Sequence, residues 1–239
     1  MPETPILEVT GLTAGYGGPP IIQDVSIQAA ARSMTAIVGA NGSGKSTLLK
    51  AIVGVIRPSS GQVRVGGELI TGLSADKAVR KGVAYVPQVA NVFPSLTVRE
   101  NLEMGGYIRK SNVRTRIDEL CQIFPDLLSH SKQRAGLLSG GQHNMLALAR
   151  GLMTDPKILI VDEPTAGLAP IFVAAVWTHI RQIRESGVAV LVVEQNTRRT
   201  LAEADFGYVL NLGRNRLSGP AEQLLHDEEV VALYIGKTS

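Results

Sequence analysis

The pattern of apolar and polar residues along the chain predicts two groups of β-strands. Short strands near the N-terminus are separated by turns rich in glycine and proline, which is typical of antiparallel sheet. We expect these strands at residues 6–10, 21–27 and 62–65. Later strands are apolar at nearly every position, as strands buried on both faces of a parallel sheet are. We expect them at residues 83–86, 158–161 and 188–193, and we expect a further short apolar strand at residues 35–38, before a glycine-rich stretch. Because the second group alternates with helical segments, the sequence predicts an α/β fold with a parallel core sheet and an antiparallel β flank.

Helical patterns dominate from about residue 95 to residue 151. Thr97 followed by Glu100 matches the capping box that begins many helices, and an apolar pattern over residues 113–124 stops before Pro125. We therefore expect a helical lobe inserted into the core. No repeat, low-complexity tract or long linker divides the sequence, so residues 1–239 are predicted to form a single domain.

The composition is typical of a globular protein. Lysine and arginine number 24 against 21 aspartates and glutamates and are scattered along the chain, so nucleic acid is not expected as a partner. The start of the chain lacks the pattern of a signal peptide, and no apolar run approaches the about 18 residues of a membrane span. We expect the chain to stay in the cytoplasm unless a partner holds it at a membrane. The single cysteine, Cys121, excludes an intrachain disulfide and falls on the apolar side of a helical pattern, where we expect a buried thiol.

The stretch GANGSGKST at residues 39–47, here called the phosphate loop, matches G-x-x-x-x-G-K-[ST]. In such a loop backbone N–H groups surround a phosphate chain, Lys45 is expected to meet the β and γ phosphates, and the Ser46 hydroxyl can hold Mg²⁺. A helix predicted at 46–53 adds positive potential at its N-terminus. The alternative is a glycine-rich structural turn. The predicted phosphate-binding residues are Gly39, Ala40, Asn41, Gly42, Ser43, Gly44, Lys45, Ser46 and Thr47.

Two carboxylates follow the predicted strand at 158–161. Asp162 is placed to reach Mg²⁺ or its waters, and Glu163, which points the other way, is placed to accept a proton from an attacking water. The alternative is a pair of solvated acids at the end of a strand.

A second glycine-rich turn, LSGGQ at residues 138–142, precedes an amphipathic helix and offers a second anion-binding helix N-terminus. We call it the LSGGQ loop. Only the phosphate loop carries a lysine. The second loop is therefore predicted to serve a nucleotide held by a neighbouring subunit.

The order and spacing of these stretches resemble the ATP-binding cassette (ABC) ATPases over nearly the whole chain. The resemblance implies a P-loop NTPase fold, with ATP and Mg²⁺ as cofactors. It implies that Tyr16 stacks on adenine, that Gln88 touches Mg²⁺ and the attacking water, and that Glu163 is the general base. Two such chains, or this chain and a homologue, would hold two ATP molecules head to tail. The contacts to the γ-phosphate of the opposite subunit would come from Ser139, Gly140, Gly141 and Gln142.

Finer features resemble one of the two ATP-binding subunits of bacterial branched-chain amino acid importers. They are NVFPSLTVRENLEMGGY, QRAGLLSGGQHNMLALARGLM, the GLAP after the Asp-Glu pair, VEQN and the terminal ALYIG. The subtype implies integral-membrane permease partners, an indirect link to a solute-binding protein, and a peripheral location on the cytoplasmic face of the inner membrane. Relatives that energise urea or short-amide uptake look similar, so the solute stays open.

Two positions depart from the common ABC pattern. The switch position, a histidine in most cassettes, is Gln195, and Ala169 stands where many cassettes have an aspartate. A glutamine can hydrogen-bond a γ-phosphate but cannot be a cation or pass a proton as imidazole can. Gln195 is still predicted to act in hydrolysis, at a site slower than one that carries histidine. The alternatives are an exporter or lipid-extraction motor, a soluble cassette protein acting on ribosomes or DNA, and a nucleotide-binding scaffold that does not hydrolyse.

The loop after Gln88 carries apolar residues that predict a partner surface. Val89, Val92, Phe93 and Pro94 are expected to form a groove that receives a cytoplasmic helix of the permease. The alternative is that Phe93 packs inside the helical lobe.

Overall fold

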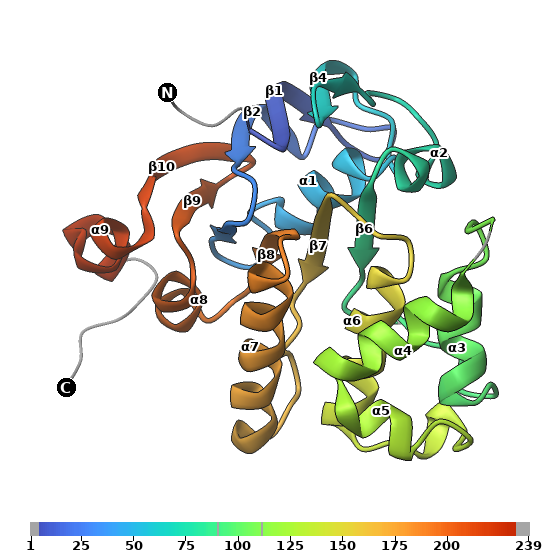
Figure 1. The fold of residues 1–239 in the computed structure, drawn as a ribbon. Helices are drawn as coiled ribbons and strands as arrows, with labels where there is room; N and C mark the ends of the chain where they lie inside the picture. The colour runs from blue at the N-terminus through green and yellow to red at the C-terminus, as the bar shows by residue number, and fades with distance from the viewer. Residues whose placement is uncertain (1–4, 90, 111, 233–239) are drawn as a thin grey trace.

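Two β-sheets of different kinds pack together in the structure, a computed structural model that describes residues 5–89, 91–110 and 112–232 (Figure 1). The larger sheet has the strand order β10-β9-β3-β8-β7-β6. Its strands are β3 (Met34–Val38), β6 (Val83–Val86), β7 (Ile158–Asp162), β8 (Ala189–Val193), β9 (Phe206–Asn211) and β10 (Arg214–Pro220). All neighbours pair in parallel except β9 and β10, which are antiparallel. The predicted parallel core sheet is confirmed, and its edge pair β9–β10 is an addition that the pattern did not predict.

The smaller sheet is antiparallel, which confirms the predicted β flank. Its order is β2-β1-β4-β5. The strands are β1 (Leu7–Ala14), β2 (Ile22–Ala29), β4 (Ser60–Val65) and β5 (Glu68–Leu69). Strand β1 continues past the predicted residues 6–10, because Gly11, at φ 60°, lies at a register shift after which pairing with β2 resumes.

The strands of the larger sheet divide their side chains between two cores. In β7, Ile158 and Ile160 face the core between the two sheets, which also holds helix α1 (Lys45–Ile52). Leu159 and Val161 face the helices on the other side. Successive side chains of a strand point to opposite faces of the sheet, which explains this division. Because both faces are buried, polar side chains emerge mainly at the ends of the strands.

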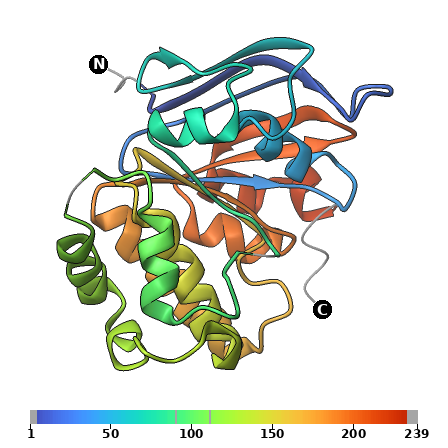
Figure 2. The same ribbon diagram turned by 90° about the vertical axis from the view of Figure 1, so that its right-hand side faces the viewer.

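Helices cover the second core and occupy the segment predicted as a lobe (Figures 1 and 2). They are α3 (Val98–Gly105), α4 (Val113–Ile123), α5 (Pro125–Ser129), the 3-10 turn η1 (Ala135–Leu137) and α6 (Gly140–Leu152), with α7 (Pro170–Glu185) packed against α6. The remaining helices are α2 (Ala75–Arg80), α8 (Thr197–Glu203), α9 (Ala221–His226) and α10 (Glu228–Val230). Thr97 and Glu100 form the predicted capping box at the start of α3. Pro125 begins α5 as well as following α4, since proline is favoured at the first position of a helix. The division of the chain into one domain stays a prediction.

The structure also shows how far Cys121 is buried and whether a helix could span a membrane. Cys121 is partly rather than fully buried against the lobe's core, and desolvation raises the pKa of its thiol. Among the described residues, no helix is both long and apolar enough to cross a membrane.

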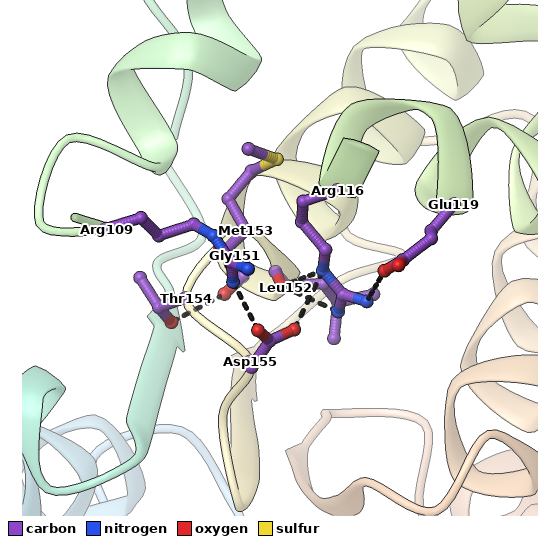
Figure 3. Close-up of polar contacts among 8 residues, drawn as sticks. All are labelled: Arg109, Arg116, Glu119, Gly151, Leu152, Met153, Thr154 and Asp155. Atoms are coloured by element: carbon purple, nitrogen blue, oxygen red, sulfur yellow. Dashed lines mark hydrogen bonds and ion pairs between the residues drawn. The ribbon is translucent and has the colours of Figure 1, made fainter. Parts of the chain in front are cut away.

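Two arginines fix the C-terminal end of α6 (Figure 3). Arg116 of α4 donates from Nη2 to the Leu152 carbonyl at 2.9 Å, and Arg109 donates from Nη1 to the Met153 carbonyl at 3.1 Å. The Asp155 carboxylate, between α6 and β7, forms ion pairs with both guanidinium groups. The last carbonyls of a helix lack intrahelical partners and favour cations. This cluster therefore stabilises the end of α6 that lies away from the LSGGQ loop.

Candidate active site

The loops that follow β3, β6, β7 and β8 meet at one edge of the larger sheet, because the carboxyl ends of parallel strands share an edge. The phosphate loop follows β3, and the other loops carry Gln88, Glu163 and Gln195. A cavity of about 240 Å³ lies at this edge. It is lined by Ile21, Asn41, Gly42, Gly44, Lys45, Ser46, Thr47 and Glu163. The fold thus brings most of the predicted phosphate-binding residues together with the predicted base.

The phosphate loop has a shape that its glycines make possible. Gly44 has φ 99°, a left-handed conformation that glycine adopts readily, and a Cβ atom on Gly39 would lie 2.2 Å from the Leu210 carbonyl oxygen. Gly44 is the N-cap of α1, and no side chain of the described residues caps this helix, so its first N–H groups are available to a ligand. The buried Ser43 hydroxyl has no hydrogen-bond partner within the described residues. These free donors fit a phosphate group.

Lys45 folds back over the phosphate loop. Its ammonium donates to the Gly39 carbonyl at 2.7 Å and to the Ala40 carbonyl at 3.0 Å. Desolvation lowers the pKa of Lys45, while the neighbouring carboxylates of Glu163 and Asp162 raise it. A cation held inside the loop fits the negative charge of a phosphate chain.

Asp162 lies at the end of β7, only 5% exposed, beside the start of α1. Its Oδ1 accepts a hydrogen bond from Ser46 Oγ at 3.4 Å, and its Oδ2 accepts one from Tyr85 Oη at 3.2 Å. Desolvation raises the pKa of Asp162, and hydrogen bonds from Tyr85 and Ser46 oppose that rise. A carboxylate next to a hydroxyl gives the hard oxygen ligands that Mg²⁺ prefers.

Glu163 receives hydrogen bonds from the side chains of two other strand ends. Its Oε2 accepts from Gln88 Nε2 at 2.9 Å and from Gln195 Nε2 at 2.7 Å. Its backbone N–H donates to the Val193 carbonyl at 2.8 Å. Glu163 has φ 47°, which is uncommon for a residue with a side chain, and such strain gathers at functional sites. Three predicted site residues, far apart in the sequence, therefore meet at one carboxylate oxygen.

The LSGGQ loop lies apart from this cavity. Ser139 Oγ accepts from the Gln142 N–H at 3.4 Å, and Gln142 Oε1 accepts from the Ser139 N–H at 3.0 Å, so the two residues cap α6 reciprocally. Gly140 is the first residue of α6, and a Cβ on Gly141 would lie 2.7 Å from the Phe172 ring. Ser139, Gly141 and Gln142 line a separate cavity of about 290 Å³ between α6 and α7. The cavities at the two predicted phosphate-binding loops have no lining residue in common.

Two further positions lie on the surface. Tyr16 is 61% exposed in the turn between β1 and β2, and the Lys50 ammonium of α1 lies 5.8 Å from the centre of its ring. The exposed ring is thus beside the helix that begins at the phosphate loop. Ala169 is the N-cap of α7 and makes no side-chain cap, which an aspartate there would be able to make.

Two polar residues to which the sequence assigned no role, Tyr85 and Glu194, hydrogen-bond to residues of the site. Tyr85 holds Asp162, as described above, and Glu194 holds the two loops around Glu163. Glu194 Oε1 accepts from the Thr165 N–H at 2.8 Å and from Thr165 Oγ1 at 2.6 Å. Its Oε2 accepts from the Gln195 N–H at 3.2 Å. The available signal was an acid directly after the apolar run at 188–193.

Comparison with known proteins decides the family. The model of the ABC transporter family matches residues 22–166. The chain belongs to the ABC transporter family. It is 41% identical over 222 residues to the high-affinity branched-chain amino acid transport ATP-binding protein BraG of Pseudomonas aeruginosa, covering 92% of this chain and 95% of that protein. It is 42% identical over 233 residues to the probable branched-chain amino acid transport ATP-binding protein LivF of Archaeoglobus fulgidus, covering 97% and 99%.

Solved ABC cassettes share the fold. The structure of the ADP conformation of an ATP-binding cassette of an ABC transporter matches with a TM-score of 0.86 at 28% identity, over 98% of this chain and 100% of that one. The chain is therefore an ABC ATPase, a nucleotide-binding and ATP-hydrolysing cassette with a P-loop NTPase fold.

Proposed function

We propose that this ABC ATPase binds MgATP beside the phosphate loop, hydrolyses it with Glu163 as general base, and energises a membrane importer for branched-chain amino acids. The single observation that carries the hydrolytic part is the carboxylate of Glu163, whose Oε2 receives the amides of Gln88 at 2.9 Å and Gln195 at 2.7 Å. A carboxylate oriented at the edge of the cavity is suited to take a proton from water. In this proposal Gln88 and Gln195 also orient that water.

The groups that bind the nucleotide come from this cavity and from residues around it. Lys45 and the uncapped N-terminus of α1 bind the phosphates, and the exposed ring of Tyr16 stacks on adenine. Ser46, Asp162 and Gln88 hold Mg²⁺. The bound ion supplies positive charge that neutralises oxygens of the β and γ phosphates.

Gln195 gives this site different electrostatics from a site with a histidine at the switch position. Its amide donates a hydrogen bond but adds no positive charge and relays no proton. We infer that Gln195 positions the γ-phosphate and the water, and that turnover is slower than at a site carrying histidine.

The LSGGQ loop acts, in this proposal, on a nucleotide held by a second cassette. It has no lysine, and its residues line a cavity of about 290 Å³ that does not include the phosphate loop. The second cassette is another copy of this chain or a homologous ATPase. Each interface then combines the phosphate loop of one subunit with Ser139, Gly140, Gly141 and Gln142 of the other.

A groove beside Gln88 is proposed to receive a cytoplasmic helix of the permease. A cavity of about 240 Å³ lies between the loop after β6, α3 and α6. Two apolar side chains that line it are exposed, Tyr107 by 68% and Met104 by 46%, and in the loop after Gln88, Val89 is exposed by 73% and Phe93 by 39%. Val92, in contrast, is buried in the lobe's core. Exposed apolar groups around a hollow favour a partner surface. The loop after β6 carries both Gln88 and the exposed Val89 and Phe93. A permease helix bound to this loop would therefore be linked to Gln88.

The solute assignment rests on similarity to the two relatives named for branched-chain amino acid transport. In this proposal the chain is also linked indirectly to a solute-binding protein and lies on the cytoplasmic face of the inner membrane. The test is ATP-driven uptake by vesicles that contain the chain with its permease subunits and binding protein. We expect uptake of leucine, isoleucine or valine that stops with Glu163→Gln. Uptake of urea or a short amide in preference to leucine would reject the solute while leaving the ATPase assignment intact.

A further inference from the structure

Glu194 is a buried acid without a countercharge. The residue is 3% exposed, and within residues 5–89, 91–110 and 112–232 no lysine, arginine or histidine forms an ion pair with it. Desolvation raises the pKa of its carboxyl group. Burying a carboxylate is unfavourable unless hydrogen bonds replace the lost water. The hydrogen bonds that the Glu194 carboxylate accepts therefore indicate its role.

Each oxygen of Glu194 holds a different loop of the active site. Oε1 accepts the N–H and the hydroxyl of Thr165, at 2.8 and 2.6 Å, in the loop after β7. Oε2 accepts the backbone N–H of Gln195 at 3.2 Å, in the loop after β8. Thr165 lies two residues after Glu163, and the side chain of Gln195 reaches the Glu163 carboxylate at 2.7 Å.

The loop after β7 is held from a further side. Asn144 of α6 donates from Nδ2 to the Pro164 carbonyl, between Glu163 and Thr165. All three residues of the short segment 163–165 are thus hydrogen-bonded: Glu163 to Val193, Pro164 to Asn144 and Thr165 to Glu194. Among the residues that the structure describes, Glu194 is the one whose side chain joins the end of this segment, Thr165, to the backbone N–H of Gln195.

We propose that Glu194 is a positioning residue that sets the distance between the general base Glu163 and the switch residue Gln195. In this role it acts through its hydrogen bonds to Thr165 and Gln195. The inference rests on the proposed function, because it assigns Glu194 a role only if Glu163 and Gln195 act in hydrolysis. A positioning role predicts that disturbing Glu194 slows the chemical step and leaves ATP binding nearly unchanged.

Glu194→Gln tests the proposal with almost no change of volume. Its carbonyl oxygen can still accept from Thr165, but its NH₂ group faces the Gln195 N–H, and two donors repel each other. We expect the single-turnover rate to fall about tenfold or more, with ATP affinity within about twofold of the parent.

Changes at Thr165 give a second, independent arm. Thr165→Ser keeps the N–H and the hydroxyl and is expected to hydrolyse ATP at close to the parent rate, whereas Thr165→Val removes the hydroxyl and slows it. The control is the same substitution at Thr200, Thr200→Val, because the fully buried Thr200 donates its hydroxyl to the carbonyl of Asn196, the N-cap of α8, at 2.7 Å and not to the loop after β7. The loss in the double variant Glu194→Gln/Thr165→Val should be smaller than the product of the single losses.

The outcomes separate this inference from the proposed function. A parent-like rate in both Glu194→Gln and Thr165→Val overturns the positioning role. A fall in ATP affinity as large as the fall in rate also overturns it, since that result marks general disruption of the fold. If Glu163→Gln is inactive, both results reject only the positioning role of Glu194 and leave the proposed function intact. If Glu163→Gln hydrolyses ATP like the parent, the proposed base itself fails.

Discussion

The phosphate loop and the LSGGQ loop both lead into the N-terminus of a helix, yet their surroundings differ. The phosphate loop carries an ammonium, Lys45, which lines one cavity together with the carboxylate of Glu163, and a second carboxylate, Asp162, lies against Ser46. The first N–H groups of α1 have no side-chain cap. The LSGGQ loop has no lysine, and Ser139 and Gln142 cap its helix reciprocally. A glycine-rich turn before a helix therefore marks an anion-binding element but does not tell whether the element is a complete site.

The difference extends to how each loop is held. The phosphate loop is fixed by its own sheet, between β3 and α1. The LSGGQ loop is carried by α6, whose far end is bound by Arg109, Arg116 and Asp155 (Figure 3). A helix anchored at one end can present its other end to a separate molecule. The comparison thus favours a complete ATP site at one loop and a contribution to a partner's site at the other.

The largest expected effect belongs to the carboxylate beside the phosphate loop. Glu163→Gln keeps the shape of the side chain but removes the base, so we expect single-turnover hydrolysis to fall by about 10² to 10⁴-fold while MgATP still binds. Rapid-quench measurement with the purified chain checks this. Hydrolysis within about threefold of the parent would remove Glu163 from the mechanism.

Nucleotide affinity should depend on the ammonium of the same loop. Lys45→Ala removes a positive charge against the phosphates and should weaken ATP binding by about 1.5 to 3 kcal/mol, or roughly ten- to a hundredfold. Titration calorimetry measures it, with Lys77→Ala on the exposed face of α2 as a control that keeps the parent affinity. Equal affinities in the two variants would argue against Lys45 as a phosphate ligand.

Gln195 should affect rate more than binding. Gln195→Ala removes the amide 2.7 Å from Glu163 and is expected to slow hydrolysis by about tenfold with a smaller change in ATP affinity. Gln195→His should bind ATP and hydrolyse it at the parent rate or faster. An alanine variant with the rate and affinity of the parent would show that Gln195 is a bystander.

The smallest effect on hydrolysis is expected at the anchor of α6. Arg116, with a side chain 16% exposed, loses its bonds to the Leu152 carbonyl and to Asp155 in Arg116→Met, so the free energy of unfolding should fall by about 1 to 3 kcal/mol. Its neighbour Glu119 has a side chain 55% exposed, and Glu119→Gln should change stability by less than about 0.5 kcal/mol. Denaturant titration compares them. Equal losses would mean that the contacts of Arg116 with the Leu152 carbonyl and with Asp155 contribute nothing to stability.

Local motifs predicted the parts of the site that are contiguous in sequence. The glycine spacing of residues 39–47 and the acids after an apolar strand depend on near neighbours, so the pattern of residues contains them. The edge strand β10 escaped prediction, because its exposed positions follow no apolar pattern and it is defined by pairing with β9.

Contacts between distant residues escaped prediction for the same reason. Tyr85 and Asp162 are 77 positions apart, and Thr165 and Glu194 are 29 apart. No spacing rule connects such pairs before the strands are aligned in the sheet. The sequence marked Glu194 only as part of VEQN and assigned it no role, and only the folded loops give its carboxylate three donors.

Mixing two inactive variants of the chain tests most directly whether the two loops serve different ATP sites. Glu163→Gln lacks the base, and Ser139→Arg blocks the LSGGQ loop with a bulky cation, so each is expected to be inactive when paired with itself. If the loops act across the interface, a mixed pair holds one complete site, made of the Ser139→Arg chain's phosphate loop and the Glu163→Gln chain's LSGGQ loop. An equal mixture should then recover about a quarter of the parent ATPase activity, as random pairing predicts. A mixture no more active than the separate variants would contradict the account.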